Sequence, residues 1–398
     1  MKSQQAFLAT VVAVGTLLVG CGETDGPGSA LAEKWSRPGG PESDFLSKGS
    51  WTATDELWIY ANIDSSRIEA VRLDDGTEAW HLPLEENVCE ISPVNEAGLV
   101  AVRDHPSGSH SCDRVTVVDT ADGDVVWSET FESIGGRSEG GGMVGLTETT
   151  ASVTTACAIE RWDAATGDRL EPLRARGGST ELGSFGCRVA TTGRTGLIPE
   201  KDGLVGVDVD TGKRVWTVAG ADPYVGALYA TEPIVADLGF EGTQGVRAID
   251  PGSGQVGKII GRSLDAGATT PTLGSAAVVD ERIFGSYGEE PSGSDDAGAV
   301  RAWDLSSGTE AWSRVGEAGD TFLGADENGV YIGRGAQSES GYRVVRRDLD
   351  DGSDEVVGTV EASPAVVTKV GDLLLVGTVD ASSGDSETTA LELPSTGS

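Results

Sequence analysis

The stretch Asp304-Leu-Ser-Ser-Gly308-Thr-Glu-Ala-Trp312 contains a motif that recurs along the chain. The same order of Asp, then Ser, Thr or Asp, then Gly, and four residues later Trp, is found at 119–127 and 208–216. Weaker copies lie between them, and those at Gly167 and Gly254 lack the Trp. Asp, Ser and Thr side chains bond the backbone of tight turns, and Gly accepts the positive φ of a bulged hairpin. Each copy therefore predicts a hairpin.

The spacing of the turn glycines predicts the architecture. They lie 42 to 54 residues apart, at Gly76, Gly123, Gly167, Gly212, Gly254, Gly308, Gly352 and Gly397. One unit, 88–127, contains apolar runs at 88–94, 98–103, 114–119 and 125–127. Four short strands repeated about every 45 residues are typical of a propeller blade. We predict an all-β fold, a single eight-bladed β-propeller of four-stranded antiparallel blades over residues 31–398.

The last repeat is incomplete, because the chain ends one residue after Gly397. A matching segment lies at the other end, where Leu31-Ala-Glu-Lys-Trp35-Ser-Arg-Pro38 is similar to the outer strand around Trp312. We expect this N-terminal segment to supply the missing outer strand and close the ring, which removes the exposed sheet edges. The alternative is that Trp35 belongs to a tether. The recurring Trp predicts packing between blades, because each buries a large apolar area.

Residues 1–20 have the pattern of a signal peptide. Lys2 precedes an apolar stretch over 6–19, which is shorter than the roughly 20 residues that span a bilayer. Leu18-Val19-Gly20-Cys21 follows and resembles the lipobox of bacterial lipoproteins. The resemblance implies cleavage before Cys21, lipidation of its sulfur and acylation, as by palmitate, with residues 21–30 as a flexible tether. We expect the domain on the outer, extracytoplasmic face of the cell membrane. An ordinary secretory signal is the alternative.

Four further cysteines follow Cys21, an even number that fits disulfides in an oxidising compartment: Cys89, Cys112, Cys157 and Cys187. Short loops close more readily, which favours the pairs Cys89–Cys112 and Cys157–Cys187 over the two other pairings. The alternative is a metal site that uses these thiols with His105 and His110. Because no CxxC or HxxxH spacing supports it, we expect no metal site.

Charge excludes one class of partner. The chain carries 29 Lys and Arg against 64 Asp and Glu, a net charge of −35. Such a surface repels nucleic acid, so no nucleic-acid partner is expected. The only histidines are His81, His105 and His110, and they show no recognisable catalytic triad. We assign no catalytic residue from the sequence.

The repeat resembles those of pyrroloquinoline-quinone (PQQ) dehydrogenase-like propellers, most closely at 246–254 and 300–312. In the quinone dehydrogenases of that superfamily the ring carries PQQ, Ca²⁺, a catalytic Asp and often a vicinal cysteine pair. Here no two cysteines are adjacent and no CxxCH haem motif is present. The other branch is non-catalytic and includes the propeller lipoprotein of the outer-membrane β-barrel assembly machinery. The resemblance therefore implies a protein-binding or scaffold propeller that is not an enzyme and has no cofactor.

Other functions remain open alternatives: a PQQ-dependent oxidoreductase with unknown cofactor-binding residues, or a sensor that binds a ligand or carbohydrate. The Gly-, Ala- and Asp-rich composition resembles a high-GC actinobacterial protein, whose envelope generally lacks the assembly machinery. We therefore expect protein or peptide partners in the cell envelope without naming them, and a monomer anchored to the membrane by its lipid. Partners should bind the irregular loops opposite the hairpin turns, at 104–113, 238–245, 287–298, 334–341 and 380–388.

Overall fold

The computed structural model describes sixteen segments of the chain. They are residues 30–39, 51–62, 66–109, 111–131, 144–155, 157–175, 189–201, 203–231, 233–240, 242–261, 273–287, 300–314, 320–335, 342–360, 366–379 and 386–394. Within these segments the named elements are β-strands, numbered β1 to β32. No helix in the described part of the chain is long and apolar enough to cross a membrane.

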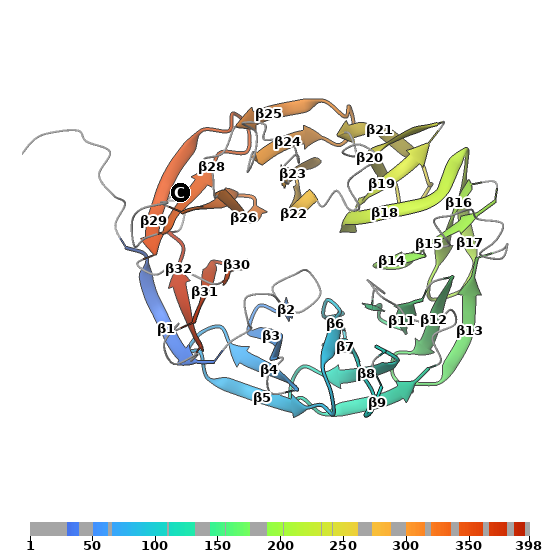
Figure 1. The fold of residues 1–398 in the computed structure, drawn as a ribbon, viewed down its shortest axis with the longest axis horizontal. Coiled ribbons are helices and arrows are strands. Elements are labelled where there is room, and N and C mark those ends of the chain that lie inside the picture. Colours follow the sequence, from blue (N-terminus) through green and yellow to red (C-terminus); the bar gives the residue numbers. More distant parts are fainter. Residues whose placement is uncertain are drawn as a thin grey trace, which may run out of the picture.

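The strands form eight four-stranded sheets arranged around a ring (Figure 1). This confirms the predicted eight-bladed propeller. In each of the first seven blades the chain runs from the innermost strand to the outermost one. Blade 1 comprises β2 (Trp51–Ala53), β3 (Leu57–Asn62), β4 (Arg67–Arg72) and β5 (Glu78–Pro83). Blade 2 comprises β6 (Val88–Ile91), β7 (Leu99–Asp104), β8 (Arg114–Asp119) and β9 (Val125–Thr130).

The next five blades repeat this order. Blade 3 has β10 (Val144–Leu146), β11 (Thr150–Thr154), β12 (Ala158–Asp163) and β13 (Arg169–Arg174). Blade 4 has β14 (Ala190–Thr192), β15 (Thr195–Glu200), β16 (Gly203–Asp208) and β17 (Arg214–Ala219). Blade 5 has β18 (Ala221–Thr231), β19 (Ile234–Phe240), β20 (Thr243–Ile249) and β21 (Val256–Gly261). Blade 6 has β22 (Leu273–Val279), β23 (Arg282–Tyr287), β24 (Val300–Asp304) and β25 (Glu310–Arg314). Blade 7 has β26 (Asp320–Asp326), β27 (Gly329–Gly335), β28 (Tyr342–Arg347) and β29 (Asp354–Val360).

Blade 8 joins the two ends of the chain. It contains β30 (Val366–Val370), β31 (Leu373–Val379) and β32 (Ser386–Glu392), and its outer strand is β1 (Ala32–Pro38). β1 lies beside β32 (Figure 1) and pairs antiparallel with it, so that Trp35 lies opposite Ala390. The predicted ring closure by an N-terminal outer strand is therefore present.

The recurring motif forms the hairpin turn between the third and outer strands of a blade. In the copy at 304–312, Asp304 Oδ1 accepts the Ser307 N–H at 2.7 Å, and the Gly308 N–H donates to the Asp304 carbonyl at 2.9 Å. Hydrogen bonds from Ser306 and Ser307 to the carboxylate lower the pKa of Asp304 to about 2. Gly308 has φ +68°, the left-handed region that favours glycine.

Each Trp of the motif packs on the turn of the next blade. Trp80 of blade 1 lies on Gly123 of blade 2, where an added Cβ would come within 2.7 Å of its ring. Its Nε1 donates to the Thr120 carbonyl, three residues before that glycine, at 2.8 Å. The same contact with glycine and carbonyl recurs for Trp35, Trp127, Trp216 and Trp312. The Trp of one copy of the motif thus contacts the Gly of the copy in the next blade, not the Gly of its own blade.

A different side chain makes this contact after a copy that lacks Trp. Blade 3 has no Trp in β13, and Gly212 of blade 4 instead meets Arg161 and Leu173. Arg161 Nη1 donates to the Val209 carbonyl at 2.6 Å, again three residues before the turn glycine. The guanidinium therefore replaces the indole N–H as hydrogen-bond donor.

The up-and-down strand order gives the ring two faces. We call the side that carries the motif turns the turn face. The opposite side, which we call the loop face, carries the loops between the second and third strands and the connections between blades. Of the expected irregular loops, 104–109 and 111–113 are described, whereas 288–299, 336–341 and 380–385 lie outside the described residues. The prediction for 238–245 was wrong. β19 and β20 pair up to Phe240↔Thr243, and Gly242 at φ +74° permits this tight hairpin.

Candidate functional site

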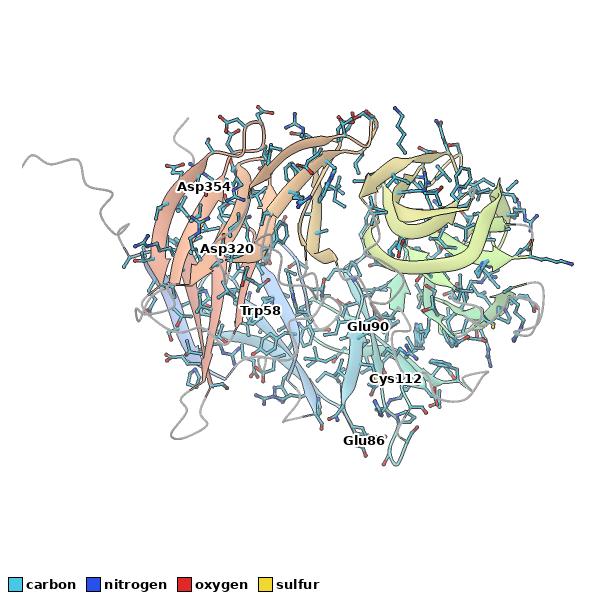
Figure 2. All side chains as sticks on the ribbon, turned by 45° about the horizontal axis from the view of Figure 1, so that its top comes forward. Trp58, Glu86, Glu90, Cys112, Asp320 and Asp354 are labelled. Carbon is cyan, nitrogen blue, oxygen red and sulfur yellow. A yellow bond between two sulfur atoms is a disulfide. The ribbon has the colours of Figure 1, made fainter. Side chains whose placement is uncertain are left out.

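On the loop face of blade 2, a disulfide cross-links a loop to the inner strand. Cys89 lies in β6, the inner strand. Cys112 lies in the β7–β8 loop just before β8 (Figure 2). Their sulfur atoms form a disulfide with S–S 1.94 Å and Cα atoms 6.2 Å apart. This is one of the two pairs that short loop closure favours. The bond ties a loop with few regular contacts to the rigid inner strand.

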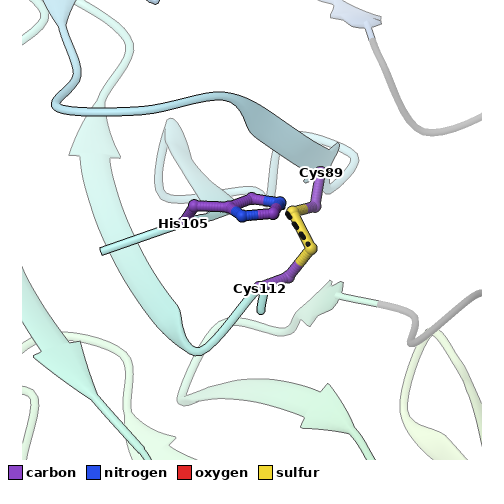
Figure 3. A group of neighbouring side chains, drawn as sticks. All are labelled: Cys89, His105 and Cys112. Carbon is purple, nitrogen blue, oxygen red and sulfur yellow. Dashed lines mark hydrogen bonds between the residues drawn. A yellow bond between two sulfur atoms is a disulfide. The ribbon is translucent and has the colours of Figure 1, made fainter. Parts of the chain in front are cut away.

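His105 points at this disulfide (Figure 3). Its Nε2 lies 3.4 Å from Cys112 Sγ, and its Nδ1 lies 3.4 Å from the Ser109 carbonyl oxygen. A carbonyl only accepts, so this contact favours the tautomer with the proton on Nδ1. The lone pair of Nε2 then faces the sulfur. The ligand atoms of Cys89, His105 and Cys112 all lie within 4.8 Å of one another.

Two charged side chains flank the cross-link. Arg103 is 2% exposed, and its Nε donates to the Cys112 carbonyl at 2.8 Å. Glu90 follows Cys89 on β6, and its Oε2 accepts the Val144 N–H of blade 3 at 2.8 Å. Burial raises the pKa of Glu90 to about 8, against the opposing effects of that hydrogen bond and of the Arg103 charge. Glu90 therefore links the inner strands of two blades and changes charge in mildly alkaline conditions.

An ion-pair network holds the loop against the blade connection. The Asp104 carboxylate is fully buried, and Arg114 contacts it through Nε at 3.1 Å and Nη2 at 2.5 Å. Arg114 Nη1 also reaches Glu85 at 2.9 Å, and Glu85 accepts the Ser107 N–H at 3.1 Å. These bonds keep the beginning of the loop in one position. A partner would therefore meet a preorganised surface here.

We expect Glu90→Gln to stabilise the protein in alkali. The raised pKa means that the folded state keeps its proton up to about pH 8, whereas the unfolded chain releases it near pH 4.5, so stability falls as the pH rises between these values. Gln keeps the oxygen that accepts from Val144 and cannot ionise. The free energy of unfolding at pH 9, measured with urea, should rise by about 1–3 kcal/mol and change little at pH 4.

The control for this prediction is Glu86→Gln, which removes a carboxylate from the connection between β5 and β6 (Figure 2). Glu86→Gln removes the same charge but no hydrogen bond to blade 3. A pH-independent effect of Glu90→Gln, or an equal alkaline gain in both variants, would contradict the assignment.

The other residues singled out in the sequence lie apart from this site or beyond the described segments. Cys157 is disulfide-bonded, while Cys187, its predicted partner, lies outside the described residues, as do Cys21 and His110. His81 lies on β5, and its Nδ1 is 2.7 Å from Glu78. Sequence reasoning missed Glu90 and Arg103, which carry no motif. The only signal was their place next to a cysteine and at a strand end.

A hollow lies on the turn face, where the ring closes between blades 8 and 1. It has a volume of about 1050 Å³ and is lined by the first turns of both blades and by the start of β1, including Thr54, Asp55, Gly371, Asp372, Ala32 and Lys34. No cavity could be predicted here from sequence, because its walls come from residues near both ends of the chain.

One family model accounts for most of the chain. The model described as outer membrane protein assembly factor BamB matches residues 29–170 and 113–353. The chain belongs to this family. No curated protein matches by sequence.

Solved structures share the fold of this BamB-family chain at low sequence identity. BamB from Moraxella catarrhalis is 14% identical with a TM-score of 0.57, over 93% of this chain and 100% of that one. The quinohemoprotein alcohol dehydrogenase ADHIIG from Pseudomonas putida HK5 is 14% identical with a TM-score of 0.51, over 93% and 77%. Dihydro-heme d1 dehydrogenase NirN is 13% identical with a TM-score of 0.56, over 90% and 78%. The fold is thus common to an assembly factor and to dehydrogenases.

Proposed function

We propose that this protein is a lipid-anchored, extracytoplasmic propeller that binds protein or peptide partners through its loop face and performs no chemistry. Membership of the BamB family supports a protein-binding propeller. The observation that carries the proposal is the direction of β1. β1 begins at Ala32, opposite Glu392, the turn-face end of β32, and runs towards the loop face.

This direction fixes where a tether would leave the ring. With a lipid on Cys21, eight residues lie between the anchor and Ala30, which lines the turn-face hollow and pairs with Thr359 near the end of β29. Their reach is at most about 30 Å, since an extended chain spans roughly 3.3–3.6 Å per residue. The turn face would therefore lie towards the membrane, and the loop face, with the cross-linked loop of blade 2, would point away from it. That side is where an envelope protein can approach without hindrance.

The charge of the chain favours a basic partner surface. A net charge of −35 raises the association rate of positively charged proteins and repels acidic ones. The predicted actinobacterial origin leaves the identity of that partner open. A carbohydrate or small-ligand sensor with the same fold would differ by binding a glycan or small molecule in place of a protein.

A PQQ-dependent oxidoreductase is the second candidate, because two dehydrogenases share the fold. PQQ would need a Ca²⁺ ion held by several oxygen ligands. In the described segments, the group of three or more metal-ligating side chains consists of two cysteines and a histidine, a soft set that does not suit Ca²⁺. The described residues therefore do not fit PQQ with Ca²⁺, and we derive no reaction through it.

The experiment is a pull-down from membranes with the lipidated chain, compared with the Cys21→Ser form. We expect stoichiometric recovery of specific envelope proteins with the lipidated chain and much weaker recovery with Cys21→Ser. The proposal fails if both forms recover nothing and the purified domain oxidises an alcohol or sugar after PQQ and Ca²⁺ are added.

A further inference from the structure

We propose that Cys89, His105 and Cys112 form a redox-gated binding site for a zinc-class divalent ion. In the disulfide state the loop is closed by a covalent bond, and in the reduced state the same three side chains would close it around a metal. This inference is independent of the protein-binding role.

Three features of the cluster support it. The two Sγ atoms and a histidine nitrogen lie within 4.8 Å of one another, on two chain segments that the blade holds together. The ring of His105 is oriented by its Nδ1 contact with the Ser109 carbonyl, which is how metal-binding histidines are commonly held, and Nε2 is directed at the sulfur. Two thiolates and one imidazole are a ligand set typical of Zn²⁺.

The surroundings of the cluster add to the case. The Asp113 carboxylate, next in the chain, is not among the groups that lie within 4.8 Å of one another, so the fourth position of the tetrahedral site would be left to a water molecule. The guanidinium of Arg103 donates to the Cys112 carbonyl and fixes the backbone beside the ligand. The reduced cluster would therefore keep its position without the S–S bond.

The exchange needs a reductant, which we assign to the dithiol class. A dithiol reduces the Cys89–Cys112 bond, taking its own sulfurs to a disulfide and leaving two thiols on the protein. The metal then replaces the two thiol protons, which pass to solvent, and binds two thiolates and the lone pair of His105. With Zn–S bonds of about 2.3 Å in a tetrahedral site, the sulfurs would separate to about 3.8 Å. The Cα atoms, 6.2 Å apart, would allow this by side-chain rotation.

The test uses the full mature chain with Cys21→Ser, reduced by a trialkylphosphine under nitrogen and titrated with Co²⁺ as a spectroscopic probe for Zn²⁺. We expect one Co²⁺ per chain with thiolate-to-metal charge-transfer absorption, and none for the oxidised protein. His105→Ala should weaken the affinity at least about tenfold. An unchanged affinity in His105→Ala, or equal binding by the oxidised protein, would overturn the proposal.

A second measurement does not depend on a folded variant. The reduced wild-type chain is alkylated with and without Zn²⁺, and each cysteine is quantified by mass spectrometry. Zn²⁺ should slow the alkylation of Cys89 and Cys112 at least about tenfold and leave Cys157 and Cys187 unaffected. Equal alkylation of all four with and without Zn²⁺ would refute the site.

Discussion

Replacing Trp35 with Ala is expected to lower the free energy of unfolding by about 3–5 kcal/mol, as is usual for a buried Trp. Trp35 is 6% exposed, and it packs on Gly76 of blade 1 while its Nε1 donates to the Leu73 carbonyl at 3.0 Å. The substitution removes that apolar contact and leaves the buried carbonyl without its donor. Chemical unfolding followed by tryptophan fluorescence and circular dichroism measures the loss.

The matched control is Trp80→Ala, between blades 1 and 2. Trp80 is 7% exposed and makes the equivalent contacts with Gly123 and Thr120. If β1 is a true outer strand, both substitutions should destabilise the protein to a similar extent. A large loss for Trp80→Ala with almost none for Trp35→Ala would show that the N-terminal segment is a dispensable tether and that the ring is not closed by it.

Gly123→Ala should destabilise the protein by about 2–5 kcal/mol, although it adds only a methyl group. Gly123 has φ +80°, and its added Cβ would lie 2.7 Å from the Trp80 ring. The left-handed backbone contributes about 1–2 kcal/mol of this effect. The remainder comes from forcing the indole away from the turn, since Trp80 is buried and cannot move freely. Denaturant titration at neutral pH measures the change.

Gly242→Ala separates the two contributions. Gly242 has φ +74°, almost the same backbone conformation, and an added Cβ would meet no atom within 4 Å. This variant should therefore lose only the backbone part, about 1–2 kcal/mol. If Gly123→Ala is no worse than Gly242→Ala, the turn glycine is required for its φ alone, and close packing of Trp on the turn does not hold the blades together.

The fold was largely predictable because one local rule, a hairpin with Asp and Gly, repeats about every 45 residues. Ring closure also followed, since the segment around Trp35 has the residues that the last repeat lacks. The substitution of Arg161 for a Trp was not predictable. Its guanidinium comes from β12, not β13, and reaches the Val209 carbonyl only when the blades pack.

The candidate site was harder to predict from the sequence than the fold. The pair Cys89–Cys112 followed from loop length, but the place of His105 depends on its contacts with the Ser109 carbonyl and with Cys112 Sγ. No spacing rule encodes these contacts. Glu90 could not be singled out either, because 64 acidic residues make each carboxylate commonplace until its burial is known.

The most direct test of the protein-binding role is site-specific photo-crosslinking in cells that make the lipidated protein. A photoreactive residue replaces either Ser107, exposed on the loop face of blade 2, or Asp122, exposed in a turn on the opposite face. We expect specific protein adducts from position 107 that are lost with Cys21→Ser, and few from position 122. Adducts from position 122 alone, or equal adducts from both faces, would contradict binding through the loop face.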